Sequence, residues 1–344
     1  MSQYLKTLGK QIVAPLPATW RNYLRLRYRR SRDVLQVWRF SLHDANWYTR
    51  HSGLGGGTEK GVLQARIIKS YHRIEKGLAL PLPRPGFGAD AIAQLIEDLS
   101  IYQRRYGNDH ILQRALQTLD EYRNFSALAG TDVSAVSRAL QTHNYTPQAS
   151  GNSEGGTMEV TREAIHSAAK HDLTAFFRNR YSVRQFSPEP VSEALIEEAV
   201  RMAQKSPSVC NRESGRLFLV SSPEKARALL GYQNGNRGFG EHADKLLVIT
   251  ARLDCFLTPG ERYQCWIDGG LFAMSLIYAL HALGLGSCCL NWSVEPETDA
   301  AFKRAAGIPA DQAVVMLLAV GHLPERFRVA ISARRPIDEV LVRI

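Results

Sequence analysis

The sequence predicts an α+β protein, in which a helical N-terminal region precedes a sheet that is covered by helices. Apolar residues recur at helical spacing through most of residues 20–140. In the second half, three short apolar runs predict buried strands, at residues 217–220, 245–251 and 313–321. The run at 245–251 is apolar without alternation, so both faces of its sheet are expected to be covered. Helices are therefore expected to flank the sheet.

Length, charge and cysteine content limit the classes of protein. The 344 residues are enough for two domains, or for one domain with a large extension, and 44% hydrophobic content supports a core. The net charge is +10, and residues 1–50 carry ten Lys or Arg against two Asp. The five cysteines are odd in number and form no C-x-x-C pair, so neither a disulfide framework nor a zinc site is predicted. A reducing cytoplasm is the expected location.

No targeting or spanning segment is expected. Prolines and lysines interrupt residues 1–20, which excludes a signal-peptide core there. The longest apolar run, residues 271–285, is shorter than the roughly 20 residues that a bilayer span needs, so it predicts a buried helix.

Residues 20–50 alternate arginines with apolar side chains, which predicts a basic amphipathic helix. Such a helix either docks on an anionic membrane surface or packs on the protein with its arginines in solvent. No nucleic-acid-binding motif accompanies the charge, so nucleic acid is not an expected partner. The glycines of residues 51–61 lack the Gly-Lys-Ser/Thr of a phosphate loop and predict a flexible linker.

The periodicity then predicts helices at residues 62–76, 90–106 and 111–128. Residues 146–157 are rich in Gly, Ser, Asn and Pro and predict a second linker. The expected organisation is therefore a helical region at 1–145 with a basic start, a linker at 146–157 and a second domain at 158–344. Within that domain, helices are expected at 162–178 and 195–203. A helix at 267–283 is apolar nearly all round, which indicates burial on every side and a subunit interface.

Two guanidinium groups and a hydroxyl fall within five positions at residues 180–184. In an extended chain Arg180, Ser182 and Arg184 project to the same side, where they can hold a phosphate or another anion. The alternative is a solvated basic surface. Farther along, the turn of small and polar residues at 207–213 joins a helix to a strand, a common position for a ligand site.

Four motifs, in this order, resemble the nitroreductase family of FMN flavoproteins over roughly residues 170–344. They are Arg-Tyr-Ser-Val-Arg-Gln-Phe at 180–186, Pro-Ser with an Asn at 207–211, Gly-Leu-Gly-Ser-Cys-Cys-Leu at 284–290, and Val-Gly-His at 320–322 with Ala-Arg-Arg-Pro at 333–336. The resemblance implies a three-layer α/β/α fold with a mostly antiparallel central sheet. It also implies a homodimer with FMN at the subunit interface. The apolar tail at 337–344 would then be a strand that reaches the partner.

Carried over residue by residue, the resemblance implies cofactor-binding roles but no catalytic side chain, because the flavin carries the chemistry. Arg180, Tyr181, Ser182 and Arg184 would hold the phosphate and the pyrimidine edge of the ring. Arg334 or Arg335 would close the phosphate site. The remaining implied contacts, beside the ring and its N5 atom, are Pro207, Ser208, Asn211, Cys289, Leu290 and Asn291. Where the family often continues with Gln-Pro-Trp, this chain has Glu213-Ser214-Gly215.

The implied function is an FMN-dependent oxidoreductase that passes a hydride from NAD(P)H through flavin N5 to an organic acceptor, such as a nitroaromatic, a quinone or an activated alkene. One alternative is a specialised flavoenzyme for a single biosynthetic metabolite, with the helical N-terminal half as a lid and a membrane surface as its location. Another is a non-catalytic flavin-binding or scaffold protein. Cys288 and Cys289 are either buried packing residues or a redox pair. The histidines lack metal-ligand partners at useful spacing, so no metal site is expected.

Overall fold

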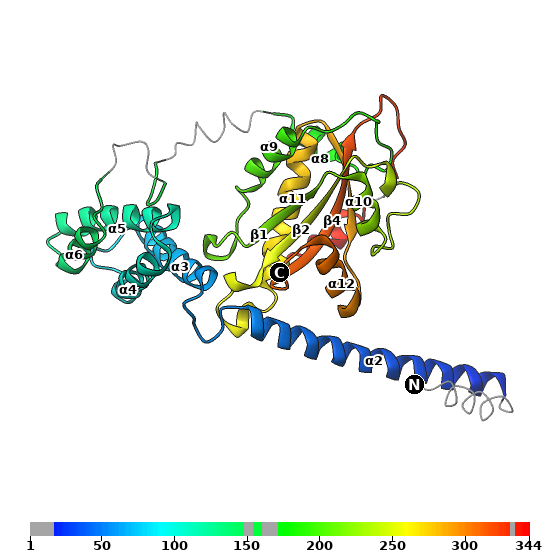
Figure 1. Ribbon diagram of the computed structural model, residues 1–344, viewed down its shortest axis with the longest axis horizontal. Coiled ribbons are helices and arrows are strands. Elements are labelled where there is room, and N and C mark those ends of the chain that lie inside the picture. Colours follow the sequence, from blue (N-terminus) through cyan, green and yellow to red (C-terminus); the bar gives the residue numbers. More distant parts are fainter. Residues whose placement is uncertain (1–16, 148–153, 160–170, 331–333) are drawn as a thin grey trace. The chain divides into compact units, whose positions relative to one another are not determined.

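The computed structural model describes residues 17–147, 154–159, 171–330 and 334–344 (Figure 1). The chain divides into two compact units, of which the first is built on α2 (Ala18–His51) and the second holds the remaining helices and the sheet. Helix α2 is the predicted basic helix, and Tyr48 is its one buried residue. Large apolar side chains are exposed along its length: Trp20, Tyr23, Leu24, Leu26, Tyr28, Val34, Leu35, Val37, Trp38 and Leu42.

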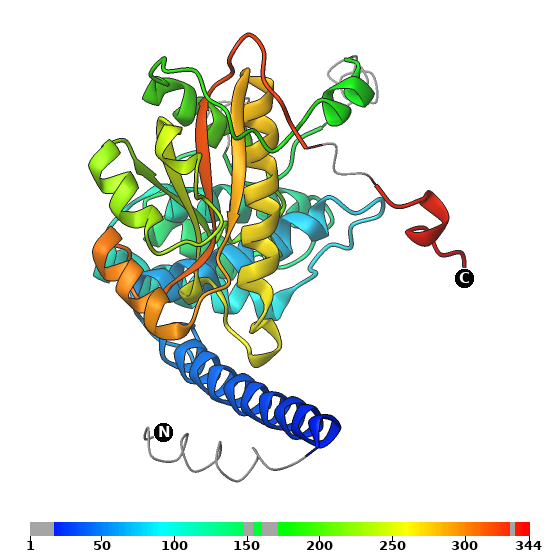
Figure 2. The ribbon, with the colours of Figure 1, turned by 90° about the vertical axis from the view of Figure 1, so that its right-hand side faces the viewer.

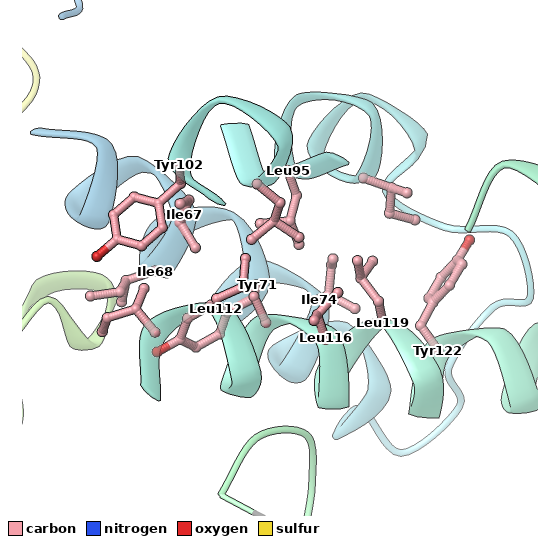
Figure 3. Close-up of a cluster of buried hydrophobic side chains, with 14 of the residues drawn as sticks. Ile67, Ile68, Tyr71, Ile74, Leu95, Tyr102, Leu112, Leu116, Leu119 and Tyr122 are labelled. Carbon is pink, nitrogen blue, oxygen red and sulfur yellow. The ribbon is translucent and has the colours of Figure 1, made fainter. Parts of the chain in front are cut away.

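Four helices form a bundle in the first part of the second unit. They are α3 (Lys60–Leu78), α4 (Ala89–Tyr106), α5 (His110–Leu128) and α6 (Ser134–Thr142), and the first three confirm the helices that the periodicity predicts. Leucine, isoleucine and tyrosine side chains from all four fill one core (Figure 3). Helix α5 begins after Asp109, whose carboxylate accepts hydrogen bonds from the backbone N–H groups of Ile111 and Leu112.

The glycine-rich segment before α3 is docked on the second domain, so the prediction of a flexible linker at 51–61 is wrong. The backbone N–H of Gly53 donates to the carbonyl of Phe256 at 2.8 Å. A Cβ at Gly53 would lie 2.6 Å from the Leu257 side chain, so this position needs glycine for close approach rather than for flexibility. Of the linker predicted at 146–157, residues 148–153 lie outside the described residues, and Glu154 and Thr157 hydrogen-bond to α5. The domain boundary placed there stays a prediction.

The second domain is built on a four-stranded antiparallel sheet with helices on both faces (Figures 1 and 2). The strands β1 (Gly215–Val220), β2 (Lys245–Arg252), β3 (Leu285–Asn291) and β4 (Gln312–His322) lie in the order β1-β2-β4-β3. Leu247 and Ile249 of β2 pack toward α9 (Glu193–Ala203) and α11 (Gln264–Ala282). Leu246 and Val248 pack toward α10 (Pro223–Leu230) and α12 (Pro296–Ala306). The predicted α+β class and three-layer arrangement are confirmed.

Helix α11 is buried on one side only, which corrects the prediction of burial on every side. Phe272, Leu276 and Leu280 lie in the core, whereas Trp266, Ile267, Leu271 and Met274 are exposed in a stripe at helical spacing. The helix is long and apolar enough by composition to cross a membrane, but half of its most apolar window is buried within the protein. The sequence pattern shows how apolar a helix is, but not whether its own protomer or a partner protomer buries each side.

Two further predictions differ from the structure. The tail predicted as a strand contains the short 3-10 helix η5 (Ile337–Glu339), and no strand lies among its described residues. The helix predicted at 162–178 falls partly on residues 162–170, which lie outside the described residues. Its described end is α8 (Leu173–Arg178), which starts after the capping residue Asp172.

Candidate functional site

The segment that carries Arg180, Ser182 and Arg184 is held along the outer edge of β3. Ser182 forms an isolated parallel bridge with Ser287, and the N–H of Val183 donates to the carbonyl of Ser287 at 2.9 Å. Val183 is buried, so the residues on either side of it point away from the core. The sequence predicted an extended segment with these side chains on one side, and the bridge supplies its anchor.

Two glycines make room for this segment on the sheet. Gly286 of β3 and Gly321 of β4 are cross-strand partners. A Cβ at Gly286 would lie 3.1 Å from the Val183 side chain, and one at Gly321 would lie 2.8 Å from the ring of Phe186. The segment therefore lies closer to the sheet than any larger residue at these two positions would allow.

The two arginines of the segment have no carboxylate partner among the residues that the structure describes. Arg184 lies over the ring of Phe239, 5.6 Å from its centroid, and contacts the carbonyl of Ser182. Burial raises the pKa of the Cys289 thiol, and the charge of Arg180 opposes that rise, which places Arg180 near the exposed side of β3. Arg180 is half-buried, Arg184 is exposed, and Tyr181 is exposed beside them. Uncompensated guanidinium groups in this setting suit a phosphate or a similar anion.

Strand β3 places its predicted residues on different faces. Cys288 and Leu290 are buried in the core, so only the backbone of Leu290 is available to a ligand. Cys289 and Asn291 point to the other side and are exposed. The two thiols are free and face opposite ways, and burial raises the pKa of Cys288. Cys288 is therefore a packing residue, whereas the exposed Cys289 is not, and their opposite orientations do not favour a redox pair.

The turn at 207–213 has a shape fixed by hydrogen bonds to its own residues and to α11. The N–H of Val209 donates to both carboxylate oxygens of Asp268 at 3.2 and 3.3 Å, and the N–H of Glu213 donates to the Ser208 hydroxyl at 3.0 Å. Cys210, Asn211 and Glu213 have positive φ values of 48°, 54° and 46°. Residues other than glycine rarely have positive φ values. Three of them in one turn indicate a strained backbone that the surrounding contacts hold in place.

The buried side chain of Arg212 holds the turn in place. Its side chain is fully buried and donates to the carbonyls of Val209 and Cys255 and to the carboxylate of Glu261, at 3.1, 2.7 and 2.5 Å. Burial alone would raise the pKa of Glu261. The hydrogen bonds from Arg212 and from the backbone of Leu257 outweigh it and leave the pKa below its ordinary value.

The predicted residues of the 207–213 turn and those of the Arg180–Arg184 segment lie at opposite ends of α11. The 207–213 turn is tied to Asp268 in its first turns, while His281, at its other end, hydrogen-bonds the carbonyl of Phe176 just before Arg180. Asp268 and His281 are 13 residues apart (281 − 268). At 1.5 Å per residue they are separated by about 20 Å along the helix. Pro207, Ser208 and Asn211 are therefore not brought to Arg180 within one chain.

The C-terminal arginines lie in the exposed tail that follows β4. Arg335 forms an ion pair with Glu339 inside the tail at 3.4 Å, and Arg334 is exposed beside it. The sequence-based expectation that they close a phosphate site stays a prediction.

Sequence reasoning missed three residues that position the predicted ones. Asp268 and Arg212 hold the turn, and the buried Gln233 donates to the side chain and the carbonyl of Asn291, both at 3.2 Å. Asp268 could have been noticed, because a carboxylate beside a long apolar helix needs a buried partner. The partners of Arg212 and Gln233 lie 49 and 58 residues away, beyond any local pattern.

Comparison with known proteins shows which family the second domain resembles. The model of the Nitroreductase family matches residues 177–247 and 230–322, a range that includes every predicted cofactor residue except the two C-terminal arginines. An "NADH dehydrogenase" of Thermus thermophilus is 27% identical over 194 residues, covering 47% of this chain and 91% of the relative. A "CLA biosynthesis enone reductase" of Lactiplantibacillus plantarum is 33% identical over 63 residues, covering 18% of this chain and 29% of the relative.

Solved structures align with the same half of the chain. A nitroreductase from Desulfovibrio desulfuricans in complex with FMN has a TM-score of 0.45 and 20% identity, covering 51% of this chain and 98% of its own. An FMN-dependent nitroreductase from Clostridium difficile has a TM-score of 0.42 and 21% identity, covering 50% and 98%. With the family match, the four motifs and the three-layer fold in agreement, the part of this chain at residues 177–322 belongs to the nitroreductase family.

Proposed function

We propose that this protein is an FMN-dependent oxidoreductase that uses NADH or NADPH to reduce a small organic acceptor. The observation that carries the proposal is the pair Arg180 and Arg184. Neither has a carboxylate partner among the described residues, and both lie on a segment that two paired glycines hold against β3. The family of the domain and the oxidoreductase names of its relatives support the same class.

The chain's residues fit FMN by charge and by shape. Arg180 and the Ser182 hydroxyl suit the phosphate, and Arg184 suits the pyrimidine edge of a ring that gains negative charge on reduction. Bound FMN would supply a ring that accepts hydride from the nicotinamide and returns two electrons to the acceptor. Asn291, held by Gln233, offers an amide at the exposed end of β3. The protons that the reduced acceptor takes up can come from solvent, so no side chain needs to act as an acid, a base or a nucleophile.

The proposal includes a homodimer, because one chain separates the two groups of predicted residues. A two-fold axis beside α11 would bring the 207–213 turn of one protomer toward Arg180 of its partner. The exposed stripe of Trp266, Ile267, Leu271 and Met274 is the surface that such an interface would bury.

We also propose that α2 binds an anionic membrane surface in the cytoplasm. At about 100° per residue, the exposed apolar side chains of α2 lie within an arc of roughly 200°, and most of its arginines fill the rest. The five cysteines are free thiols, which suits a reducing compartment.

The full chain is expected to sediment with vesicles of anionic lipid and not with neutral vesicles. The double variant Leu35→Glu, Trp38→Glu should abolish this sedimentation. Equal binding to both kinds of vesicle, or to neither, would contradict the membrane location.

The flavin proposal is tested by cofactor content. The purified protein is expected to be yellow, with about one FMN per chain after denaturation. Arg180→Gln and Arg184→Gln should each lower retention of FMN by at least tenfold, since each removes a charge-assisted contact worth about 1.5–3 kcal/mol. Arg304→Gln, an exposed arginine on α12, is the matched control. A colourless protein, or equal FMN content in all variants, would favour the scaffold alternative.

A further inference from the structure

Residues of the helical bundle and of the nitroreductase domain line an open cavity of about 570 Å³, next to the 207–213 turn. Tyr71 of α3 and His110 and Arg114 of α5 line one wall. Lys205, Arg216 and Arg252 of the nitroreductase domain line the other. All of these residues lie in the second compact unit, so the cavity is part of one body.

The cavity is strongly basic. Glu213 is the one acidic side chain among the described residues that line it, against six Lys or Arg. Some of these cations are balanced by carboxylates just outside, such as Arg252 by Asp254 and Arg114 by Glu154. Within the described chain, Lys205 and Arg216 have no such partner. Arg216 donates only to the backbone carbonyls of Glu213 and Gly215.

Two further observations indicate a ligand in this space. Tyr71 is 4% exposed and lines the cavity, and its hydroxyl has no hydrogen-bond partner among the described residues. Figure 3 shows Tyr71 at the edge of the buried cluster of the bundle. The surrounding protein and the charge of Arg252 lower the pKa of Arg216 by more than Cys255, Asp254 and Glu213 raise it. An oxyanion in the cavity would satisfy both groups.

The cavity adjoins the turn that contains the predicted flavin contacts. Arg201, Gln204, Glu213 and Arg216 line it, and they also line a neighbouring cavity of about 570 Å³ that contains Pro207 and Ser208. A molecule with its acidic group beside Arg216 would therefore extend along the turn whose other face carries Pro207 and Ser208.

We propose that this cavity binds the acidic group, a carboxylate or a phosphate, of the acceptor that the enzyme reduces, and that the helical bundle is present to complete the binding site. The inference rests on the proposed function, and it narrows the substrate class to anionic acceptors. Lys205 and Arg216 act as binding residues, and Tyr71 donates a hydrogen bond to the same oxyanion.

The test compares two acceptors that share a nitro group and differ in charge, para-nitrobenzoate and para-nitrobenzyl alcohol. Calorimetry on the full-length protein as purified gives their dissociation constants. The wild type is expected to bind the benzoate at least tenfold more tightly than the alcohol, with a preference that falls as salt rises. Arg216→Gln should weaken benzoate binding about tenfold and leave alcohol binding within about twofold. Arg216→Lys should retain part of the preference, and Arg304→Gln should retain all of it.

Absence of a charge preference in the wild type would overturn the inference, as would equal behaviour of Arg216→Gln and Arg304→Gln. Thermal melting of each variant reports whether it is folded, and Tyr71→Phe provides a second, uncharged variant, which should weaken benzoate binding severalfold. FMN content and reduction by NADH, measured on the same preparations, report the proposed function separately. A yellow, reducible protein without preference for the benzoate refutes only the anion site. A colourless protein refutes the flavin proposal, and its calorimetry still decides the cavity.

Discussion

At the scale of single residues, Arg212 determines the shape of the 207–213 turn more than any residue inside the predicted site. Its buried guanidinium joins the turn to Glu261 and to the backbone at Cys255. The three positive φ values of the turn cost energy that these contacts offset. Removing one member of a buried ion pair leaves the other charge without compensation.

Arg212→Met is therefore expected to destabilise the protein by about 3 kcal/mol, because Glu261 would remain half-buried without its cation. Urea unfolding measures this change. The double variant Arg212→Met, Glu261→Gln should recover part of the loss. A single variant as stable as the wild type would show that the pair does not hold the turn.

The same pair predicts a pH dependence with a defined sign. The folded-state pKa of Glu261 is below its ordinary value of 4.5, so its stabilisation is complete above that value and is lost as the pH falls through the folded-state pKa. Glu261→Gln should abolish this part of the acid dependence of unfolding free energy. The contradicting result is an identical acid profile for the variant and the wild type.

At the scale of elements, the pairing of β3 with β4 prepares the surface on which the Arg180–Arg184 segment lies. Gly286 and Gly321 face each other across the two strands, and the side chains of Val183 and Phe186 occupy the space that two Cβ atoms would fill. The position of the arginines thus depends on two residues that carry no charge.

Gly321→Val is expected to displace Phe186 and to cost about 1–3 kcal/mol by overpacking. FMN retention should fall with it, because Ser182 and Arg184 lie on the displaced segment. Gly260→Ala is the matched control, since its Cβ would meet no atom closer than 3.9 Å. Thermal melting and flavin content are measured together. Normal flavin content in Gly321→Val would contradict the claim that this close approach positions the arginines.

Local patterns predicted α2 to α5, α9, α11 and the strands β1, β2 and β4, because helical and strand periodicities are properties of short segments. They did not predict α6, α10, α12 or β3. Ser192 and the apolar residues after it, for example, are sufficient to predict α9. The anchors of the turn were not predictable in this way, because the bonds of Asp268 to Val209 join residues 59 positions apart. The tail was predicted wrongly since Val340, Leu341 and Val342 are typical of a strand, yet a strand needs an adjacent strand to pair with.

At the scale of the whole molecule, we expect a dimer whose interface includes the exposed stripe of α11. Leu271 lies near the middle of that stripe. Leu271→Glu should convert the dimer to a monomer and should lower FMN content, because the turn of one protomer completes the site of the other. Sedimentation equilibrium measures the mass, and Leu82→Glu, at an exposed position outside the sheet domain, is the control. A monomeric wild type that keeps its FMN would contradict the dimer.

The helical bundle gives the molecule a second role beyond holding a flavin. Its helices α3 and α5 supply Tyr71 and Arg114 to the basic cavity, which the matched nitroreductase residues alone would leave open. On this account the bundle determines which acceptor enters, while the nitroreductase domain determines what is done to it.

The most direct measurement of the central claim is anaerobic mixing of the purified protein with NADH and, separately, with NADPH, followed by addition of an acceptor. We expect the flavin absorbance to bleach with at least one nicotinamide and to return when para-nitrobenzoate is added. Flavin absorbance that stays unchanged with both nicotinamides would contradict it.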